Sequence, residues 1–136
     1  VRSVARNSVA ATVTGHQPRA TYYFRVGAKN AVGLSYSTVV PATTPDVPPR
    51  APSSLTGTVL SPTSAELRWR DNAVNESGFK LERRETANPT FAEIGMVGAN
   101  VVQFTDATRI AGTTYYYRVR AWNAAGNSGY SSAVRR

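Results

Sequence analysis

The stretch TYYYRVRAWN, residues 114–123, decides the fold because its residue types alternate with a period of two. Successive side chains of a β-strand point to opposite faces. One face would then carry Tyr115, Tyr117, Val119 and Ala121. The other would carry Tyr116, Arg118, Arg120 and Trp122. No helical spacing competes with this alternation, so it predicts a long strand with one face in the core and the other in water.

A turn and several further strands can be predicted around this stretch. AAGNSG at 124–129 is typical of a turn, and YSSAV at 130–134 can return as the second arm of a hairpin. Other short β-rich runs, separated by turn signals, lie at 55–59, 65–70, 79–83, 91–97 and 101–105. In the run 65–70, Ala65, Leu67 and Trp69 are expected to point inward. Short strands without a helix indicate an antiparallel β-sandwich with Greek-key connections.

Composition sets the broad limits. The chain has 136 residues, no cysteine, and 16 basic against 8 acidic residues, which gives a formal net charge of +8. Disulfides and thiolate metal sites are therefore excluded, and stability must come from a packed core. The sequence has no apolar run of transmembrane length and no signal-peptide pattern, so we expect a soluble segment without a membrane span.

The positive charge favours acidic partners such as nucleic acid, anionic polysaccharide or a phospholipid surface. The arginines are spread over predicted strand faces, however, and the sequence contains no helix-turn-helix, zinc-finger or RNA-binding motif. This distribution argues against nucleic acid as the partner.

The N-terminal part of the chain repeats the C-terminal part. YYFRVGAKN at 22–30 matches YYYRVRAWN at 115–123, an offset of 93 positions (115 − 22), and the same offset relates further identical residues from Val4 to Ser35. Tyr36 and Ser37 meet Tyr130 and Ser131 after one extra residue. A repeat of this length is domain-sized and predicts a tandem array. In the first copy, strands are expected at 9–14, 22–30 and 36–40.

The first copy contains no counterpart of residues before about 94, including the tryptophan strand. We therefore expect three parts: residues 1–42 are the C-terminal half of a domain, 43–51 are a Pro-rich linker, and 52–136 are a complete domain. From Pro41 onward, prolines lack the N–H donor, so this segment is predicted not to hold a sheet ladder. Either the chain is a piece of a longer polypeptide, or another chain completes the first half-domain by donating strands.

The second copy resembles a fibronectin type III domain. PSSL at 52–55, AELRW at 65–69 and GFKLER at 78–83 are similar to the first three strands of that family, and GTTY at 112–115 is similar to its corner. DN at 71–72 followed by NESGF at 75–79 resembles versions from secreted bacterial proteins. The resemblance implies an immunoglobulin-like, seven-stranded antiparallel β-sandwich at an extracellular or cell-surface location.

The resemblance also assigns a corner tyrosine to each copy. The hydroxyl of Tyr115 would form a hydrogen bond with the backbone before its strand, and Tyr22 would do the same in the first copy. The family usually has leucine six residues earlier, where this chain has Arg109 and, in the first copy, His16. Either Ile110 takes the inward position through a local shift, or the corner is less well packed.

No set of residues with catalytic spacing is present. His16 is the single histidine and is expected to be exposed in a turn, and the carboxylates form no recognisable pair. Asp71, Asn72 and Asn75 invite a calcium interpretation, but they lack regular ligand spacing and a closing glutamate, so turn formation explains them better. We expect no enzyme activity, no cofactor and no metal. Asn75-Glu76-Ser77 is an acceptor sequon for N-glycosylation.

One surface supports a hypothesis. In the fibronectin type III family the third and sixth strands are neighbours, so their outer face would bring together Lys80, Glu82, Tyr116, Arg118, Arg120 and Trp122. Trp122 and Tyr116 would offer stacking planes, and the cations would bind an acidic sugar or another protein. The alternative is structural: an arginine stacks on Trp122 and pairs with Glu82.

The absence of a catalytic constellation indicates a non-catalytic structural, adhesion or spacer module. The resemblance implies that it belongs to a secreted or cell-surface multidomain protein and is accessory to a carbohydrate-active enzyme. Its partners would be other domains of the same longer chain, with protein or polysaccharide as a further ligand. Two alternatives are a subunit of an extracellular filament and an ectodomain that binds a protein ligand.

Overall fold

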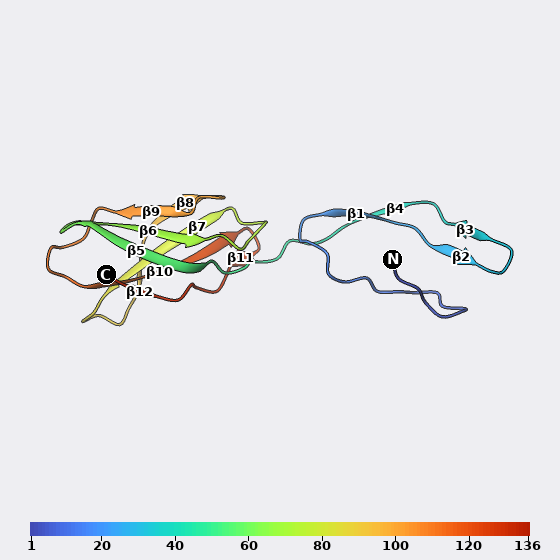
Figure 1. Ribbon diagram of the computed structural model, residues 1–136, viewed down its shortest axis with the longest axis horizontal. Coiled ribbons are helices and arrows are strands. Elements are labelled where there is room, and N and C mark those ends of the chain that lie inside the picture. The colour runs from blue at the N-terminus through green and yellow to red at the C-terminus, as the bar shows by residue number, and fades with distance from the viewer. The chain divides into compact units, whose positions relative to one another are not determined.

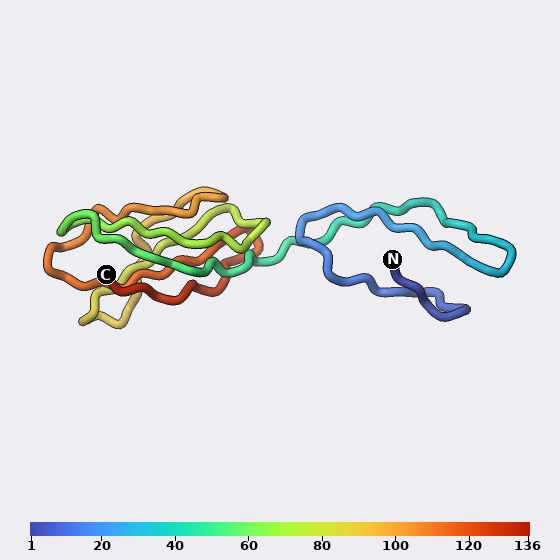
Figure 2. The backbone as a smooth tube through the Cα atoms, in the orientation of Figure 1, coloured from blue at the N-terminus to red at the C-terminus, as the bar shows by residue number.

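The computed structural model describes residues 1–136 and consists of strands without a helix (Figure 1). The chain divides into two compact units, Val1–Asp46 and Val47–Arg136, and the backbone path of each can be followed in Figure 2. All strand pairs are antiparallel, so the predicted all-β class is confirmed. No helix of the chain could span a membrane.

The second unit contains two sheets. The first sheet has the order β5 (Ser53–Ser61), β6 (Ser64–Arg70) and β9 (Gln103–Asp106). The second has the order β11 (Gly126–Asn127), β10 (Tyr115–Asn123), β7 (Gly78–Glu85) and β8 (Ala92–Gly98), and β12 (Val134–Arg135) also pairs with β10. Each strand predicted between 55 and 105 is present, with its ends displaced by a few residues.

β10 is the strand predicted from residues 114–123. Its nine residues alternate strictly between buried and half-buried positions, and it pairs with β7 from Tyr115 opposite Glu85 to Trp122 opposite Gly78. The period of two therefore places one face of β10 in the core, as predicted.

The core of the second unit lies between the facing sides of the two sheets. β6 contributes Leu67 and Trp69, and the rings of Trp69 and Phe79 pack with centroids 5.5 Å apart. The other members of this buried cluster are Leu81, Tyr115, Tyr117, Val119 and Ala121. Burying several large apolar side chains, each worth about 1.5 to 3 kcal/mol, supplies the driving force for folding.

The second arm of the predicted hairpin is not one continuous strand. It is split into β11 and β12, and serine side chains replace ladder carbonyls in between. Ser128 Oγ accepts from the Ala121 N–H at 2.9 Å, and Ser131 Oγ accepts from the Val119 N–H at 3.2 Å. The expectation of a single strand at 130–134 is wrong because these hydroxyls compete with the regular backbone ladder.

At the corner before β10, the expectation that Ile110 takes the inward position is wrong. Tyr115 accepts the predicted backbone hydrogen bond, from the Ile110 N–H at 3.2 Å. Ile110, however, is 62% exposed, while Arg109 is 8% exposed. The guanidinium of Arg109 lies 5.6 Å from the Tyr115 ring centroid and donates to the Thr113 carbonyl at 3.4 Å. An arginine stem thus fills the place of the usual leucine, which its aliphatic carbons allow.

A buried carboxylate connects the two sheets. Asp106 at the end of β9 accepts hydrogen bonds from Arg83 Nη1 on β7 at 2.6 Å and from the Tyr117 hydroxyl on β10 at 2.8 Å. Thr108 adds bonds from its backbone nitrogen and its hydroxyl. Burial opposes ionisation, but these donors outweigh it and lower the pKa of Asp106. Burial and the Asp106 carboxylate raise the pKa of Tyr117.

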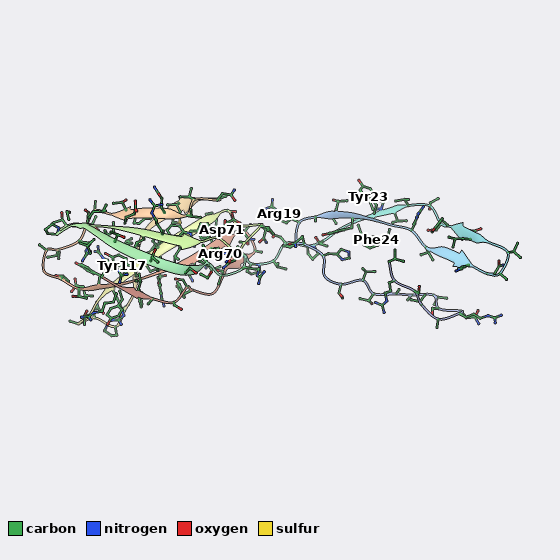
Figure 3. The ribbon with its side chains drawn as sticks, in the orientation of Figure 1. Arg19, Tyr23, Phe24, Arg70, Asp71 and Tyr117 are labelled. Atoms are coloured by element: carbon green, nitrogen blue, oxygen red, sulfur yellow. The ribbon has the colours of Figure 1, made fainter.

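The first unit forms two small sheets. β1 (Thr21–Phe24) pairs with β4 (Val40–Thr43), and β2 (Gly27–Lys29) pairs with β3 (Leu34–Tyr36). Tyr23 and Phe24 point to opposite sides of β1 (Figure 3). The strand predicted at 22–30 is interrupted at Arg25 and Val26, and the one predicted at 36–40 is displaced to either side.

Two further expectations for the first unit are wrong. Residues 9–14 form no strand; their counterparts in the second unit include β9, which pairs with β6, and the first unit has no strand equivalent to β6. Pro41 does lie in a sheet, opposite Tyr23. Thr44 N donates to the Ala20 carbonyl, and alternation from that pair puts Pro41 at a position without ladder hydrogen bonds, where proline is tolerated.

His16 is half-buried rather than exposed. Its ring centroid lies 4.1 Å from that of Tyr22 and 5.6 Å from that of Phe24. The Tyr22 hydroxyl accepts from the Gln17 N–H at 2.9 Å, as the corner assignment predicted. His16 therefore packs at the corner, in the position that Arg109 occupies in the second unit.

We predict that Trp69→Ala lowers the free energy of unfolding by about 3 to 5 kcal/mol, because it leaves a large cavity between the sheets. Urea denaturation followed by tyrosine fluorescence measures the change. Val74→Ala is the matched control, since Val74 is an exposed loop residue and should change stability by less than about 0.5 kcal/mol. Equal stability of the two variants would contradict the assignment of Trp69 to the core.

We predict that part of the stability is lost in acid through Asp106. Because folding lowers the pKa of this carboxyl, its contribution is complete above the unfolded pKa, near 4, and disappears as the pH falls through the folded pKa. Asp106→Asn should be less stable than the wild type at pH 7, and the two should converge on acidification. A difference in unfolding free energy that is constant from pH 7 to pH 2 would contradict this role.

Candidate interaction surface

The five residues predicted to form a contact surface lie together on the outer face of β7 and β10. In the register of these strands, Arg120 is opposite Lys80, and Arg118 is opposite Glu82. Tyr116 and Trp122 lie on the same face of β10, one at each end of the strand. The pairing of the third and sixth strands and the period of two together bring Lys80, Tyr116, Arg118, Arg120 and Trp122 onto one surface.

Cations and aromatic rings alternate across this face. The guanidinium carbon of Arg84 lies 4.1 Å from the Tyr116 ring centroid and 5.4 Å from that of Phe91. Arg118 lies between Phe91, at 4.0 Å, and Tyr130, at 3.6 Å. The guanidinium carbon of Arg120 lies 4.7 Å from the centroid of the same Tyr130 ring. We call this series the cation–aromatic stack: Tyr116, Arg84, Phe91, Arg118, Tyr130 and Arg120.

One carboxylate holds the stack from beneath. Glu82 is 7% exposed. Its Oε2 accepts from Nε and Nη2 of Arg118 at 2.7 and 2.6 Å, and its Oε1 accepts from the Tyr130 hydroxyl at 2.7 Å. Arg120 Nη2 lies 3.7 Å from Oε1. Burial opposes the charge, but these donors outweigh it and lower the pKa of Glu82.

The structure combines parts of both sequence hypotheses. An arginine does pair with Glu82, as the structural alternative required, but the cation over Trp122 is Lys80, at 5.5 Å, rather than an arginine. Each ring at this surface already has a cationic neighbour, and each is half-buried. The predicted stacking planes are therefore partly occupied by side chains of the chain itself.

Three members of the stack were not predicted. Arg84 continues the spacing of Lys80 and Glu82 at intervals of two, so it could have been found by extending the strand past residue 83. Phe91 lies just before β8, and Tyr130 lies between β11 and β12. Neither belongs to a periodic run, so the sequence pattern carried no signal for their place in the stack.

The charges of this face are unequal. The cations of this face are Lys80, Arg84, Arg118, Arg120 and Arg135, which lies opposite Tyr116. The carboxylates are the buried Glu82 and the exposed Glu93 opposite it, so the formal charge is +3 (5 − 2). Cation–π pairs contribute about 0.5 to 1 kcal/mol each when partly exposed, so they hold these cations in place rather than neutralise them. The arrangement can attract and orient an anion, and no nucleophile or general base belongs to it.

Polar side chains of the loop at 71–77 form hydrogen bonds with backbone groups of the loop itself and of the segment before β5. Asp71 Oδ1 accepts from the Ala73 N–H at 2.9 Å, and Asn72 Nδ2 donates to the Ala51 carbonyl at 3.0 Å. Asn75 Nδ2 donates to the Val47 carbonyl at 2.8 Å. The bond of Asp71 agrees with the turn-forming interpretation, whereas Asn72 and Asn75 bind the segment that leads into β5. No cluster of three or more His, Asp or Glu side chains could hold a metal ion. The side-chain amide of Asn75 is buried and donates a hydrogen bond. A glycosylating enzyme could therefore not reach this asparagine in the folded state.

No protein-family model matches the chain. Two curated proteins are similar in sequence. An α-amylase of Niallia circulans is 33% identical over 103 residues, which cover 73% of this chain and 7% of the amylase. The human receptor-type tyrosine-protein phosphatase F is 30% identical over 131 residues, which cover 91% of this chain and 7% of the phosphatase. The chain thus spans about 7% of the length of each relative.

Solved structures share the fold. Domains d3–d4 of the rat CD45 extracellular region match all of this chain and 73% of their own, with a TM-score of 0.74 and 13% identity. Domains FN1–FN3 of chicken CNTN1 match 89% of this chain and 43% of their own, with a TM-score of 0.62 and 19% identity. Domains A168–A170 of titin match 90% and 42%, with a TM-score of 0.61 and 23% identity. The chain therefore has a fibronectin type III-like fold, and its neighbours are domains of larger chains.

Proposed function

We propose that the chain is a non-catalytic spacer module of a longer, extracellular multidomain protein. In this proposal residues 52–136 form one module, residues 43–51 link it to the preceding one, and residues 1–42 are the C-terminal half of that preceding module. The bacterial secreted setting suggested by residues 71–79 is part of the same proposal.

The observation that carries this proposal is that the buried carboxylates Asp106 and Glu82 bind side chains of the same chain. Asp106 is enclosed by Arg83, Tyr117 and Thr108, and Glu82 is enclosed by Arg118 and Tyr130. Such groups stabilise a rigid sandwich and leave no reactive group facing a cleft. The sequence similarity to a segment of an amylase supports a place beside a carbohydrate-active domain.

A domain exchange tests this role. We predict that replacing the matching segment of the Niallia circulans α-amylase with residues 1–136 preserves hydrolysis of soluble starch and of starch granules, because a spacer only has to hold its neighbours apart. Deletion of the segment should lower granule hydrolysis alone. Release of reducing sugar is the readout, and the free chain is the control for intrinsic activity.

Two results would count against the spacer proposal. The first is hydrolysis by the isolated chain, and the second is a granule activity in the exchanged enzyme that is as low as in the deletion.

The charge of +3 on the outer face favours a second candidate function, the binding of an acidic polysaccharide. Lys80, Arg84 and Arg120 would attract uronic acid carboxylates, and the half-buried rings of Trp122 and Tyr116 would contact the sugar faces. This adhesive function is compatible with spacing, since the surface lies on one side of the module.

We predict that polygalacturonic acid binds the chain in affinity electrophoresis and that raising the salt concentration weakens binding, because ions in solution screen the attraction between charges at the protein surface. Arg84→Ala and Trp122→Ala should each reduce binding severalfold. Arg70→Ala, an exposed arginine on β6 in the other sheet, is the matched control. If the unmodified chain and all three variants were retarded equally, net charge alone would explain the binding, and the proposed binding surface would be wrong.

A further inference from the structure

The second unit holds its own N-terminal segment with a buried asparagine. Asn123 follows the inward positions of β10 and is 5% exposed. Its Oδ1 accepts from the backbone N–H groups of Ala125 and Gly126 at 2.8 and 3.2 Å. Its Nδ2 donates to the carbonyl of Val47 at 2.8 Å. One side chain thus shapes the turn after β10 and binds the segment that precedes β5.

Two further contacts complete this binding site. Asn75 Nδ2 donates to the same Val47 carbonyl at 2.8 Å. Pro48 lies over Gly126, so that a Cβ at Gly126 would be only 3.4 Å from the proline ring, and Pro49 is buried. Val47–Pro49 therefore sits as an extended peptide in a site made by Asn123, Asn75 and Gly126.

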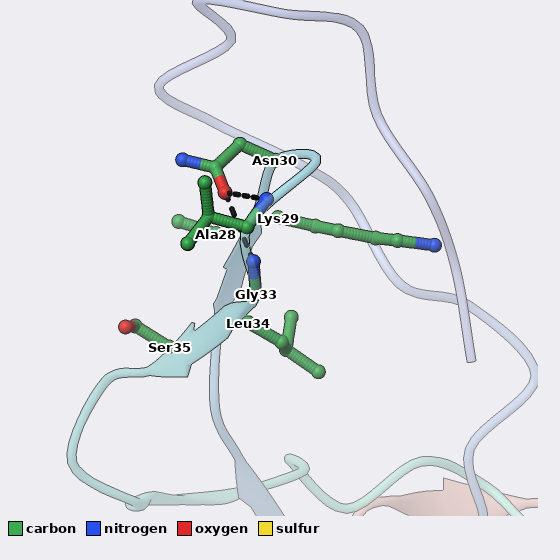
Figure 4. A pocket seen from close by; sticks show the side chains of 7 residues that line it. Ala28, Lys29, Asn30, Gly33, Leu34 and Ser35 are labelled. Atoms are coloured by element: carbon green, nitrogen blue, oxygen red, sulfur yellow. Dashed lines mark hydrogen bonds between the residues drawn. The ribbon is translucent and has the colours of Figure 1, made fainter.

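The first unit repeats this turn. Asn30 is the counterpart of Asn123 (30 + 93), and its Oδ1 accepts from the N–H groups of Val32 and Gly33 at 2.9 and 3.1 Å (Figure 4). Val32 and Gly33 are the counterparts of Ala125 and Gly126 at the same offset. The amide oxygens of Asn30 and Asn123 therefore accept equivalent backbone hydrogen bonds in the turns of the two units.

The peptide is missing from the first unit. Figure 4 shows the nitrogen of Asn30 pointing away from the turn, and this exposed atom makes no hydrogen bond. No atom would lie within 4 Å of a Cβ at Gly33. The space is a hollow of about 410 Å³ lined by residues between Ala28 and Ser35. In the second unit, the equivalent amide nitrogen binds the Val47 carbonyl and the equivalent glycine lies against the Pro48 ring. In the first unit, Asn30 Nδ2 and Gly33 have no such partner.

We propose that this hollow is a binding site for an extended, proline-containing peptide. A backbone carbonyl of the peptide accepts from Asn30 Nδ2, and the ring of the next residue, a proline, lies on Gly33. The source of the peptide is the segment that leads into the first unit within the longer polypeptide, as Val47–Pro49 leads into the second. The proposal concerns a site in residues 28–35, and it rests on the proposed function in that residues 1–42 belong to a module of a longer polypeptide.

Physical chemistry favours this occupant over a free anion. The donor is a neutral amide with one good direction for a carbonyl, and the glycine offers a flat apolar contact rather than charge. Proline keeps the peptide extended before it binds, so little conformational entropy is lost. A preceding residue is also held in the extended region by the proline ring, which exposes its carbonyl to the asparagine.

The test uses the full chain extended at its N-terminus by a second copy of residues 47–93. Residue 94 is the counterpart of residue 1, so joining residue 93 to Val1 restores the spacing of the repeat. Nuclear magnetic resonance measures hydrogen exchange of the asparagine side-chain amides. We expect exchange of the Asn30 amide to slow at least tenfold in the extended chain, and the amide of Asn123 serves as the internal standard.

Two variants of the extended chain make the test specific. Gly33→Val fills the space for the proline ring, and replacing the proline that derives from Pro48 by alanine removes the ring; each should restore fast exchange at Asn30. The backbone φ of Gly33 lies outside the left-handed region, whereas that of its counterpart Gly126 is 144°. The proline-to-alanine variant adds no backbone strain at the glycine and is therefore the deciding one of the two. Gly98→Val, at another glycine with open space, is the matched control and should keep the protection.

Three results would overturn the proposal: fast exchange at Asn30 in an extended chain that unfolds cooperatively, protection that survives both variants, and failure of the added segment to fold onto the first unit. The proposed spacer function is measured separately by starch hydrolysis, so either proposal can fail without the other.

Discussion

The period of two in β10 is the constraint on which the second unit depends. It directs Tyr115, Tyr117, Val119 and Ala121 into a dry interior against β6, and all four are almost wholly buried. The same period turns Tyr116, Arg118, Arg120 and Trp122 outward, where they meet β7 across the sheet. The core and the candidate surface are therefore two faces of one strand. A substitution that shifts its register by one residue would exchange them.

Each sheet face is completed by one carboxylate. Asp106 lies inside, at the end of β9, where it accepts from Arg83 and Tyr117 of the opposite sheet. Glu82 lies outside, beneath the cation–aromatic stack. Both acids have a lowered pKa because their donors outweigh burial. An unpaired buried charge would be strongly destabilising, whereas a carboxylate with several donors fixes one arrangement of the side chains around it. The module thus obtains rigidity from polar contacts that a ligand cannot use.

The sequence predicted those features that depend on alternation or on turn residues. The strands of the second unit and the inward Trp69 follow from local pattern, and the corner hydrogen bond of Tyr115 follows from the resemblance to the fibronectin type III family. Features that depend on a partner elsewhere were missed. Residues 9–14 have strand composition but no strand to pair with, Arg109 rather than Ile110 fills the corner, and Ser128 and Ser131 interrupt the last arm. Phe91 and Tyr130 join the stack from irregular segments, so only the folded chain brings them to Arg118.

A comparison of the two units distinguishes the contacts that a hairpin forms by itself from those that require packing against an opposite sheet. In both, the corner tyrosine accepts a backbone N–H, at 2.9 Å for Tyr22 and 3.2 Å for Tyr115. In both, a serine hydroxyl replaces a ladder carbonyl, Ser37 opposite Val26 and Ser131 opposite Val119. An arginine lies over a tyrosine ring at 3.7 Å in the first unit and 3.6 Å in the second.

The two units share these hydrogen bonds and arginine–tyrosine contacts, but they differ in how far their apolar side chains are buried. Val119 is completely buried, while its counterpart Val26 is 71% exposed. The hydrogen bonds and the arginine–tyrosine contact join residues close in sequence, so the first unit keeps them without an opposite sheet. Removal of side chains from water requires that sheet, and only the second unit contains it. Local sequence therefore sets the shape of each hairpin, and the partner strands supply the apolar burial that stabilises it.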